Sequence, residues 1–197
     1  ISESYRVLRK GGTLICFYDL WKITKLKEYF ENAKFKQLRF IEWQKTNPVP
    51  INSKVNYLTN SREIAVVGVK GAKPTFNSEY DIGVYKYPIC HSKDRFHPTQ
   101  KPLSLLSRII LASTNENSWI LDPFNGSGTT GIASSLLGRK YLGIEKETEF
   151  LEISKNRRLE LDNINKIVEY RGKIKDLSFI ENNLFLGEER QDYNIPF

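Results

Sequence analysis

The hydrophobic positions of this 197-residue chain alternate between short apolar runs and helical patterns. Residues 13–18 form a continuous apolar run, which is typical of a strand buried on both faces. Residues 19–35 repeat apolar side chains at helical spacing, with lysines opposite. The N-terminal half is therefore predicted to contain a helix over 2–10, a strand over 13–18, a helix over 19–35, and strands over 38–44 and 63–69.

The second half predicts a regular order of elements. These are a helix over 102–113, a strand over 119–121, a helix over 129–137, a strand over 140–144 and a helix over 148–161. A strand, a glycine turn, a helix, a strand and a helix in sequence indicate an open α/β sheet. Residues 71–96 show no period and predict a surface excursion. In the tail, 166–170 and 183–186 are predicted as short strands.

Composition limits the class of protein. Apolar residues make up 40% and charged residues 27%, which excludes a disordered chain. The length indicates one domain, expected over 1–161, with an extension of unknown role over 162–197. Two cysteines exclude a disulfide framework and favour a reducing, cytoplasmic setting. No apolar run reaches the roughly 18 residues of a membrane-spanning helix.

Charge indicates a class of partner. There are 30 basic and 23 acidic residues, a net charge of +7. Residues 21–54 carry eight basic and three acidic side chains, whereas residues 160–197 carry five basic and eight acidic side chains. A basic body with an acidic tail favours a polyanion such as nucleic acid. A solvated surface explains the charge equally well.

The candidate chemistry lies in the turn after the strand at 119–121. Gly126, Gly128 and Gly131 follow the strand and open a helix, and Glu145 ends the next strand. Such glycines let a ligand approach the backbone closely, and the carboxylate can accept hydrogen bonds from ribose hydroxyls. The glycines alone are also consistent with a structural turn. With Glu145 in place, the pattern predicts a nucleoside cofactor.

The residues alone leave two cofactors open. Both NAD(P) and S-adenosylmethionine suit a ribose-binding carboxylate beside a glycine turn. Asp122 argues against NAD, because a carboxylate there repels a pyrophosphate, whereas it favours the ammonium group of a methionine moiety.

Two segments carry a family resemblance. Residues 122–130, Asp-Pro-Phe-Asn-Gly-Ser-Gly-Thr-Thr, resemble the cofactor motif of DNA methyltransferases that modify adenine N6 or cytosine N4. Residues 97–102, His-Pro-Thr-Gln-Lys-Pro, resemble their companion motif, and this order matches the permuted β class. Residues 6–13 and 43–48 resemble further segments of these enzymes. The resemblance implies a Rossmann-like fold, with helices on both faces of a mostly parallel twisted sheet.

The resemblance also implies a set of residues that bind S-adenosylmethionine. Asp122 and Phe124 are expected beside its methionine and adenine parts, and Glu145 at its ribose. Lys101 is a natural partner for the carboxylate end, because it is a cation. Outside this motif His97 would be interpreted as a packed loop residue. The remaining implied contacts are Gly126, Ser127, Gly128 and Thr129 at the floor, and His97 and Thr99 beside Lys101. No metal site is predicted.

The family's catalytic loop, (Asp/Asn/Ser)-Pro-Pro-(Tyr/Phe), is not found among these residues, so no catalytic residue is predicted. We expect that loop upstream of Ile1 or on a second chain, identical or different. Its strand belongs between 119–121 and 13–18 in the family. We therefore expect a divided sheet with two free inner edges, and no activity or stable fold from the 197 residues alone.

The predicted function is that of a site-specific DNA methyltransferase acting on a flipped base in double-stranded DNA, adenine N6 ahead of cytosine N4. A prokaryotic, phage or mobile-element restriction–modification setting is implied. The short excursion implies a short recognition site. Five of its residues are candidate DNA contacts, although core packing explains the tyrosines equally well: Lys73, Tyr80, Tyr85, Lys86 and Arg95. The alternatives are a non-catalytic cofactor- or DNA-binding remnant and a nucleotide-dependent oxidoreductase.

Overall fold

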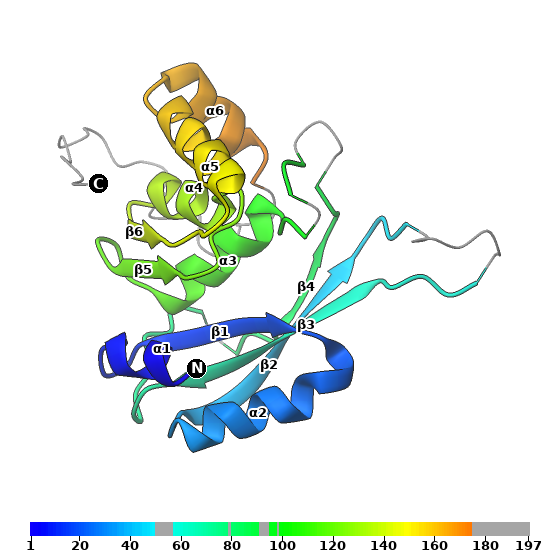
Figure 1. Ribbon diagram of the computed structural model, residues 1–197, viewed down its shortest axis with the longest axis vertical. Helices are drawn as coiled ribbons and strands as arrows, with labels where there is room; N and C mark the ends of the chain where they lie inside the picture. Colours follow the sequence, from blue (N-terminus) through cyan, green and yellow to red (C-terminus); the bar gives the residue numbers. More distant parts are fainter. Residues whose placement is uncertain (50–56, 79, 91–94, 98, 175–197) are drawn as a thin grey trace.

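The structure is a computed structural model of the chain, and it describes residues 1–49, 57–78, 80–90, 95–97 and 99–174 (Figure 1). Its elements follow one another as α1 (Ser2–Val7), β1 (Thr13–Tyr18), the 3-10 helix η1 (Leu20–Lys22), α2 (Ile23–Asn32), β2 (Lys36–Lys45), β3 (Arg62–Val69), β4 (Val84–Tyr87), α3 (Leu103–Ser113), β5 (Trp119–Asp122), α4 (Thr129–Leu136), β6 (Lys140–Gly143), α5 (Thr148–Glu160) and α6 (Ile164–Gly172).

The strands form two separate sheets. The larger has the order β1-β3-β2-β4, in which β3 is antiparallel to both neighbours and β2 is parallel to β4. The smaller consists of the parallel pair β5 and β6. The predicted α/β class is confirmed, but the larger sheet is mixed rather than mostly parallel. A short apolar run predicts burial on both faces and carries no information about the direction of its neighbours.

Helices cover both faces of the larger sheet. In β1, Leu14 and Cys16 pack with Phe30 of α2 in one hydrophobic cluster. The alternate residues Ile15 and Phe17 pack against a second cluster, which includes α3. Because successive side chains of a strand point to opposite faces, both faces of β1 are covered, and this explains its uninterrupted apolar run.

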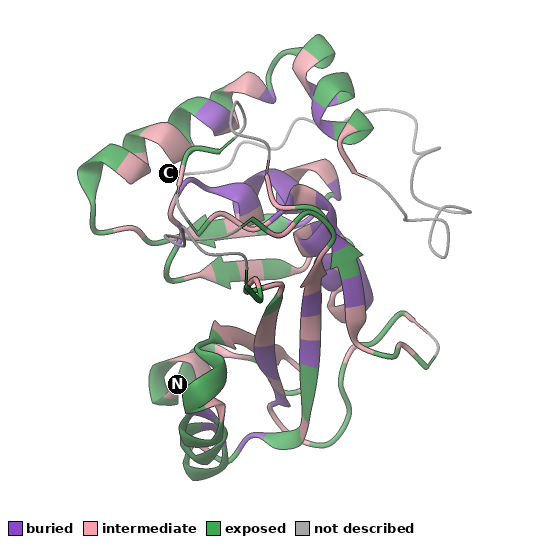
Figure 2. Ribbon diagram, turned by 90° about the vertical axis from the view of Figure 1, so that its right-hand side faces the viewer, coloured by how far each residue is buried: buried purple, intermediate pink, exposed green. Residues whose placement is uncertain are grey.

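Helix α3 joins the two sheets. Its residues Leu105 and Ile109 belong to the cluster of the larger sheet, whereas Leu111 packs with Ala133 and Leu137 from α4 and the residue that ends it. Figure 1 shows α3 between the two groups of elements, and Figure 2 shows buried residues concentrated along α3, α4 and the central strands.

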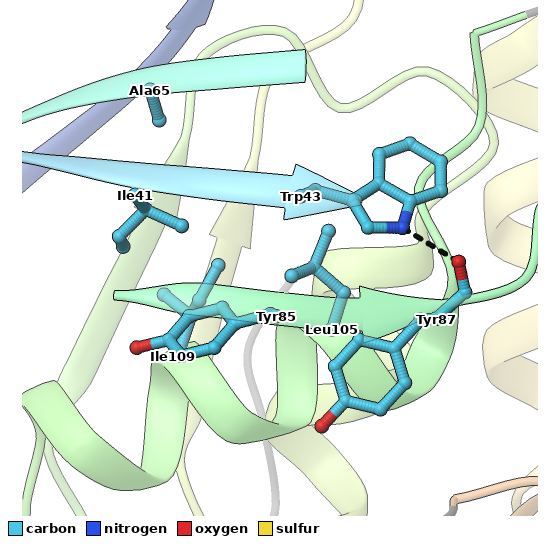
Figure 3. Close-up of a cluster of buried hydrophobic side chains, with 7 residues drawn as sticks. All are labelled: Ile41, Trp43, Ala65, Tyr85, Tyr87, Leu105 and Ile109. Atoms are coloured by element: carbon cyan, nitrogen blue, oxygen red, sulfur yellow. Dashed lines mark hydrogen bonds between the residues drawn. The ribbon is translucent and has the colours of Figure 1, made fainter. Parts of the chain in front are cut away.

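The cluster beneath the larger sheet includes part of the predicted surface excursion. Figure 3 shows Tyr85 and Tyr87 of β4 packed with Trp43, whose indole Nε1 donates to the Tyr87 carbonyl at 2.9 Å. Both tyrosines are 3% exposed. The prediction of a surface segment over 71–96 is therefore wrong for β4, which is too short to show a period in the sequence.

The predicted division of the sheet is confirmed. In the described part of the chain, β1 and β5 each pair on one side only, and Figure 1 shows these two strands at the facing edges of their sheets. One face of the smaller sheet also carries exposed apolar side chains. These are Trp119 and Leu121 of β5, Leu142 of β6 and Ile144 beyond it.

Most predicted elements are confirmed to within a few residues, with one clear exception. The predicted strand over 166–170 is wrong, because this segment lies in the helix α6, where Ile167 and Tyr170 pack against Ile132 of α4. The predicted strand over 183–186 lies outside the described residues. None of the helices formed by the described residues has the length and apolar character needed to cross a membrane.

Candidate functional site

The turn between β5 and α4 depends on two glycines in the left-handed region. Gly126 has φ +52° and Gly128 has φ +80°. A Cβ atom on Gly128 would lie 2.7 Å from the Cβ of Ser154 in α5, whereas one on Gly126 would meet only the His97 ring, at 3.9 Å. Packing and backbone conformation therefore both require glycine at 128. At 126 only the conformation requires it, because the His97 ring lies at an ordinary contact distance.

Glu145 follows β6 and closes over this turn. Its Oε2 accepts a hydrogen bond from the Gly126 N–H at 2.7 Å, and its Oε1 accepts one from the Glu147 N–H at 3.0 Å. The Glu147 N–H first, and then that of Gly126, hold the pKa of Glu145 below its ordinary value. A carboxylate can accept about four hydrogen bonds, so the group can still accept from a further donor, such as a hydroxyl.

The lowered pKa of Glu145 predicts how the turn responds to pH. The ionised carboxylate stabilises the turn fully above the ordinary value of 4.5, and this contribution is lost as the pH falls through the lowered pKa. We expect the difference in melting temperature between the wild-type protein and Glu145→Gln to be constant from about pH 8 to 5, and to shrink only in more acidic solution. Thermal unfolding at several pH values measures this difference, and a change near neutrality would contradict the assignment.

Asp122 and Phe124 have different roles at the start of the turn. The Asp122 carboxylate accepts from the Phe124 N–H at 3.1 Å and from the Thr130 hydroxyl at 2.6 Å, so it braces the turn from within. The Phe124 side chain is 89% exposed. An exposed ring at the mouth of the turn can stack on a planar group.

The predicted companion segment lies against the same turn. The Gln100 side-chain oxygen accepts from the Ser127 hydroxyl at 3.0 Å, which ties the two motifs together. His97 Nδ1 accepts from the Thr99 N–H at 3.1 Å, and its ring packs edge-on against Phe150 with 4.4 Å between centroids. The structure thus places His97 beside Gly126, and Thr99 is hydrogen-bonded to His97.

Lys101 contacts the larger sheet. Its ammonium pairs with Glu63 of β3 at 3.0 Å and lies 5.2 Å from the centre of the Phe17 ring. Glu63 also pairs with Lys45 at 2.9 Å. Burial alone would raise the pKa of Glu63, but the two lysines outweigh it and hold that pKa below its usual range. Two cations around one carboxylate leave a net positive charge beside the motif.

Four residues that support the site were not predicted. Gln100 and Asn125 lie inside the two motifs, so their positions could have indicated a role. The Asn125 side-chain oxygen accepts from the Tyr141 hydroxyl at 2.5 Å, and burial raises the pKa of Tyr141, which keeps that hydroxyl protonated. Arg157 of α5 bonds the turn from below. It lies in a charged helix and carries no signal in the sequence.

The candidate DNA contacts divide into two groups. Lys73, Tyr80, Lys86 and Arg95 are exposed. The prediction is wrong for Tyr85, because its ring is buried in the core and covered by the Arg108 guanidinium at 4.2 Å. In the described ranges, no three His, Cys, Asp or Glu side chains are grouped so that they could hold a metal ion.

The fold is that of an α/β protein with a glycine turn between a strand and a helix, and comparison with known proteins gives its family. Residues 1–156 match the family model of the N6/N4 methyltransferases, described as DNA methylase. The chain belongs to this DNA methylase family.

Individual relatives agree with this family. The type II methyltransferase M2.MboI of Moraxella bovis is 39% identical over 189 residues, which are 89% of this chain and 68% of the relative. M.HinfI of Haemophilus influenzae is 32% identical over 180 residues, which are 82% of this chain and 50% of the relative. The chain thus spans half to about two thirds of the length of these relatives.

Solved structures agree on the fold. The complex of M1.HpyAVI with S-adenosylmethionine has a TM-score of 0.71 and 31% identity, over 80% of this chain and 79% of that one. The cytosine-N4-specific PvuII methyltransferase has a TM-score of 0.67 over 84% and 71% of the two chains. At 16% identity, the latter likeness concerns the fold alone.

Proposed function

We propose that this chain binds S-adenosylmethionine at the turn between β5 and α4 and serves a DNA methyltransferase that modifies adenine N6. The observation that carries the proposal is the geometry of Glu145, whose two oxygens are held at the turn by the N–H groups of Gly126 and Glu147 and face the segment around His97. This suits the two hydroxyls of a ribose.

The other residues of the site fit the rest of this cofactor. The exposed ring of Phe124 suits its adenine, and the turn around Gly126 and Ser127 would form its floor. His97, Thr99 and the positively charged group around Lys101 suit its methionine end, where a carboxylate has to be held. When bound, the cofactor supplies an electrophilic methyl group, and the residues of this chain hold and orient it.

The proposed substrate is an exocyclic amine of a base in double-stranded DNA. Such an amine is paired within the duplex, so the base has to be flipped out before it can react. The family comprises N6 and N4 enzymes. We place adenine N6 first because the likeness to a cytosine-N4 enzyme, at 16% identity, concerns the fold alone. The exposed residues Lys73, Tyr80, Lys86 and Arg95 are the proposed DNA contacts.

The catalytic loop is proposed to come from a polypeptide segment outside these 197 residues, upstream of Ile1 or on a second chain. The support is that β1 and β5 each pair on one side only among the described residues, so that each has an edge that can accept a further strand. The chain alone is then expected to transfer no methyl group, and the chain supplied with that segment to transfer it.

Mass analysis of nucleosides tests the proposed reaction. DNA is treated with labelled S-adenosylmethionine and the protein together with the segment that carries the loop. We expect labelled N6-methyladenine, whereas labelled N4-methylcytosine would overturn the choice of base. Absence of any methylated base despite cofactor binding would favour a non-catalytic cofactor-binding protein.

Phe124 and Tyr80 give a matched pair of variants, because both rings are almost fully exposed, at 89% and 99%. Neither change to alanine removes a packed core side chain, so we expect little loss of stability. Phe124→Ala is expected to weaken S-adenosylmethionine binding about tenfold, as for loss of one stacked base. Tyr80→Ala should leave that affinity unchanged and weaken DNA binding. Calorimetric titration of each variant measures both affinities, and the reverse pattern would exclude the proposed roles.

A further inference from the structure

The structure contains a buried cation directly beneath the turn. Arg157 of α5 is 5% exposed, and its Nη1 donates to the Ser127 carbonyl at 2.6 Å. The same nitrogen lies 3.2 Å from the Ser127 hydroxyl oxygen and 3.1 Å from that of Thr129. Within the described part of the chain Arg157 has no carboxylate partner, and its Nε has no hydrogen-bond acceptor. Burial of a cation without a direct carboxylate partner is costly, so its retention points to a specific role.

Arg157 is also connected to the companion motif. The Ser127 hydroxyl donates to Gln100 and accepts from Arg157, so it links the two. The Gln100 side-chain oxygen also accepts from the Phe96 N–H at 3.0 Å, and the Phe96 ring lies 5.0 Å from the Arg157 guanidinium. Arg157, Ser127, Gln100 and Phe96 therefore form one connected group that joins α5, the glycine turn and the segment before α3. Arg157 also contacts the Tyr170 side chain of α6.

A second contact supports the same helix. Ser154 lies one helical turn before Arg157 and packs against Gly128 so closely that no Cβ fits there. Helix α5 thus touches the turn at two successive positions, once by close packing and once by charge. The planar guanidinium can bond several oxygens in a fixed geometry, which an ammonium group on a flexible stem cannot reproduce.

We infer that Arg157 is a positioning residue for the cofactor, one that holds the two binding motifs in their mutual arrangement without touching the ligand. This inference rests on the proposed binding of S-adenosylmethionine. Arg139 provides a matched control. It is 6% exposed and also bonds backbone carbonyls, those of Leu137 and Thr114, but at the far end of α4 from the turn.

The test compares Arg157→Met, Arg157→Lys and Arg139→Met in the intact protein. The measurements are S-adenosylmethionine affinity by calorimetry, and hydrogen exchange of the turn amides without ligand. We expect both Arg157 variants to weaken binding about tenfold or more and to speed exchange over 123–130, since bonds to a charged donor are lost or misplaced. Arg139→Met should keep the wild-type affinity and exchange rate in the turn, even if it melts earlier.

Each result has a defined meaning. Wild-type affinity and exchange in Arg157→Lys or Arg157→Met would overturn the inference, and so would equal losses in Arg139→Met. If both Arg157 variants fail to fold while Arg139→Met folds, Arg157 serves the fold as a whole and the specific role is overturned. If the wild-type protein itself binds no S-adenosylmethionine, the proposed function fails, whereas the exchange rates in ligand-free protein still decide whether Arg157 holds the turn.

Discussion

Replacing Glu145 with alanine is expected to lower the affinity for S-adenosylmethionine about 100-fold or more. The change removes the acceptor of the Gly126 N–H and the acceptor proposed for two ribose hydroxyls. A hydrogen bond to a charged group contributes about 1.5 to 3 kcal/mol. The loss of two such bonds to the ribose therefore accounts for a decrease in affinity of about 100-fold or more. Glu145→Gln keeps one acceptor oxygen and should fall between the alanine variant and the wild-type protein.

Glu147→Gln is the control for this experiment. Glu147 is the next carboxylate along the chain, and its exposed side chain pairs with Lys146 at 3.3 Å. The Glu147→Gln variant removes one negative charge near the turn, as the Glu145 variants do, but it removes no hydrogen-bond acceptor from the turn. Isothermal titration of the three variants gives the comparison. An affinity for Glu145→Ala within about threefold of that for Glu147→Gln would show that the carboxylate is not a cofactor ligand.

Gly128→Ala is expected to destabilise the protein by about 3 to 5 kcal/mol and to abolish detectable cofactor binding. Two costs combine at this position. The backbone has φ +80°, which disfavours any residue with a side chain, and the new methyl group would lie 2.7 Å from Ser154. Because α5 and the turn cannot separate without breaking the contacts of Arg157, the clash has no easy relief.

Gly71→Ala separates the two costs. Gly71 has φ +91°, but apart from its chain neighbours no atom of the described residues lies within 4 Å of a Cβ placed on it. We therefore expect only the backbone cost, about 1 to 2 kcal/mol, with cofactor binding unchanged. Chemical denaturation of both variants measures the difference. Equal losses of stability would mean that the packing of α5 against the turn contributes little.

The sequence predicts the elements around the site well, because each has a clear local signal. The glycines at 126 and 128 indicate the turn, and the position of Glu145 after the next strand indicates its contact with that turn. Both follow from the order of strand and helix. The division into two sheets is also predicted, from the family's missing strand between β1 and β5.

The failures concern features that depend on distant neighbours. The burial of Tyr85 depends on Trp43 and Leu105, which are far away in the sequence. The antiparallel direction of β3 relative to its neighbours depends on which strands flank it, and the hydrophobic pattern carries no information about that. Arg157 lies in a helix rich in charged residues, and only the folded structure shows that its guanidinium is turned inward beneath Ser127.

The segment from Phe96 to Lys101 has a consequence for the whole molecule. Gln100 fastens it to the turn beside the smaller sheet, and Lys101 fastens it to Glu63 in the larger one. No backbone ladder joins these sheets in the part of the chain that the structure describes. A ligand that binds to this segment therefore adds its binding energy to the coupling that α3 already provides between the two sheets, so that occupancy of one turn raises the melting temperature of both.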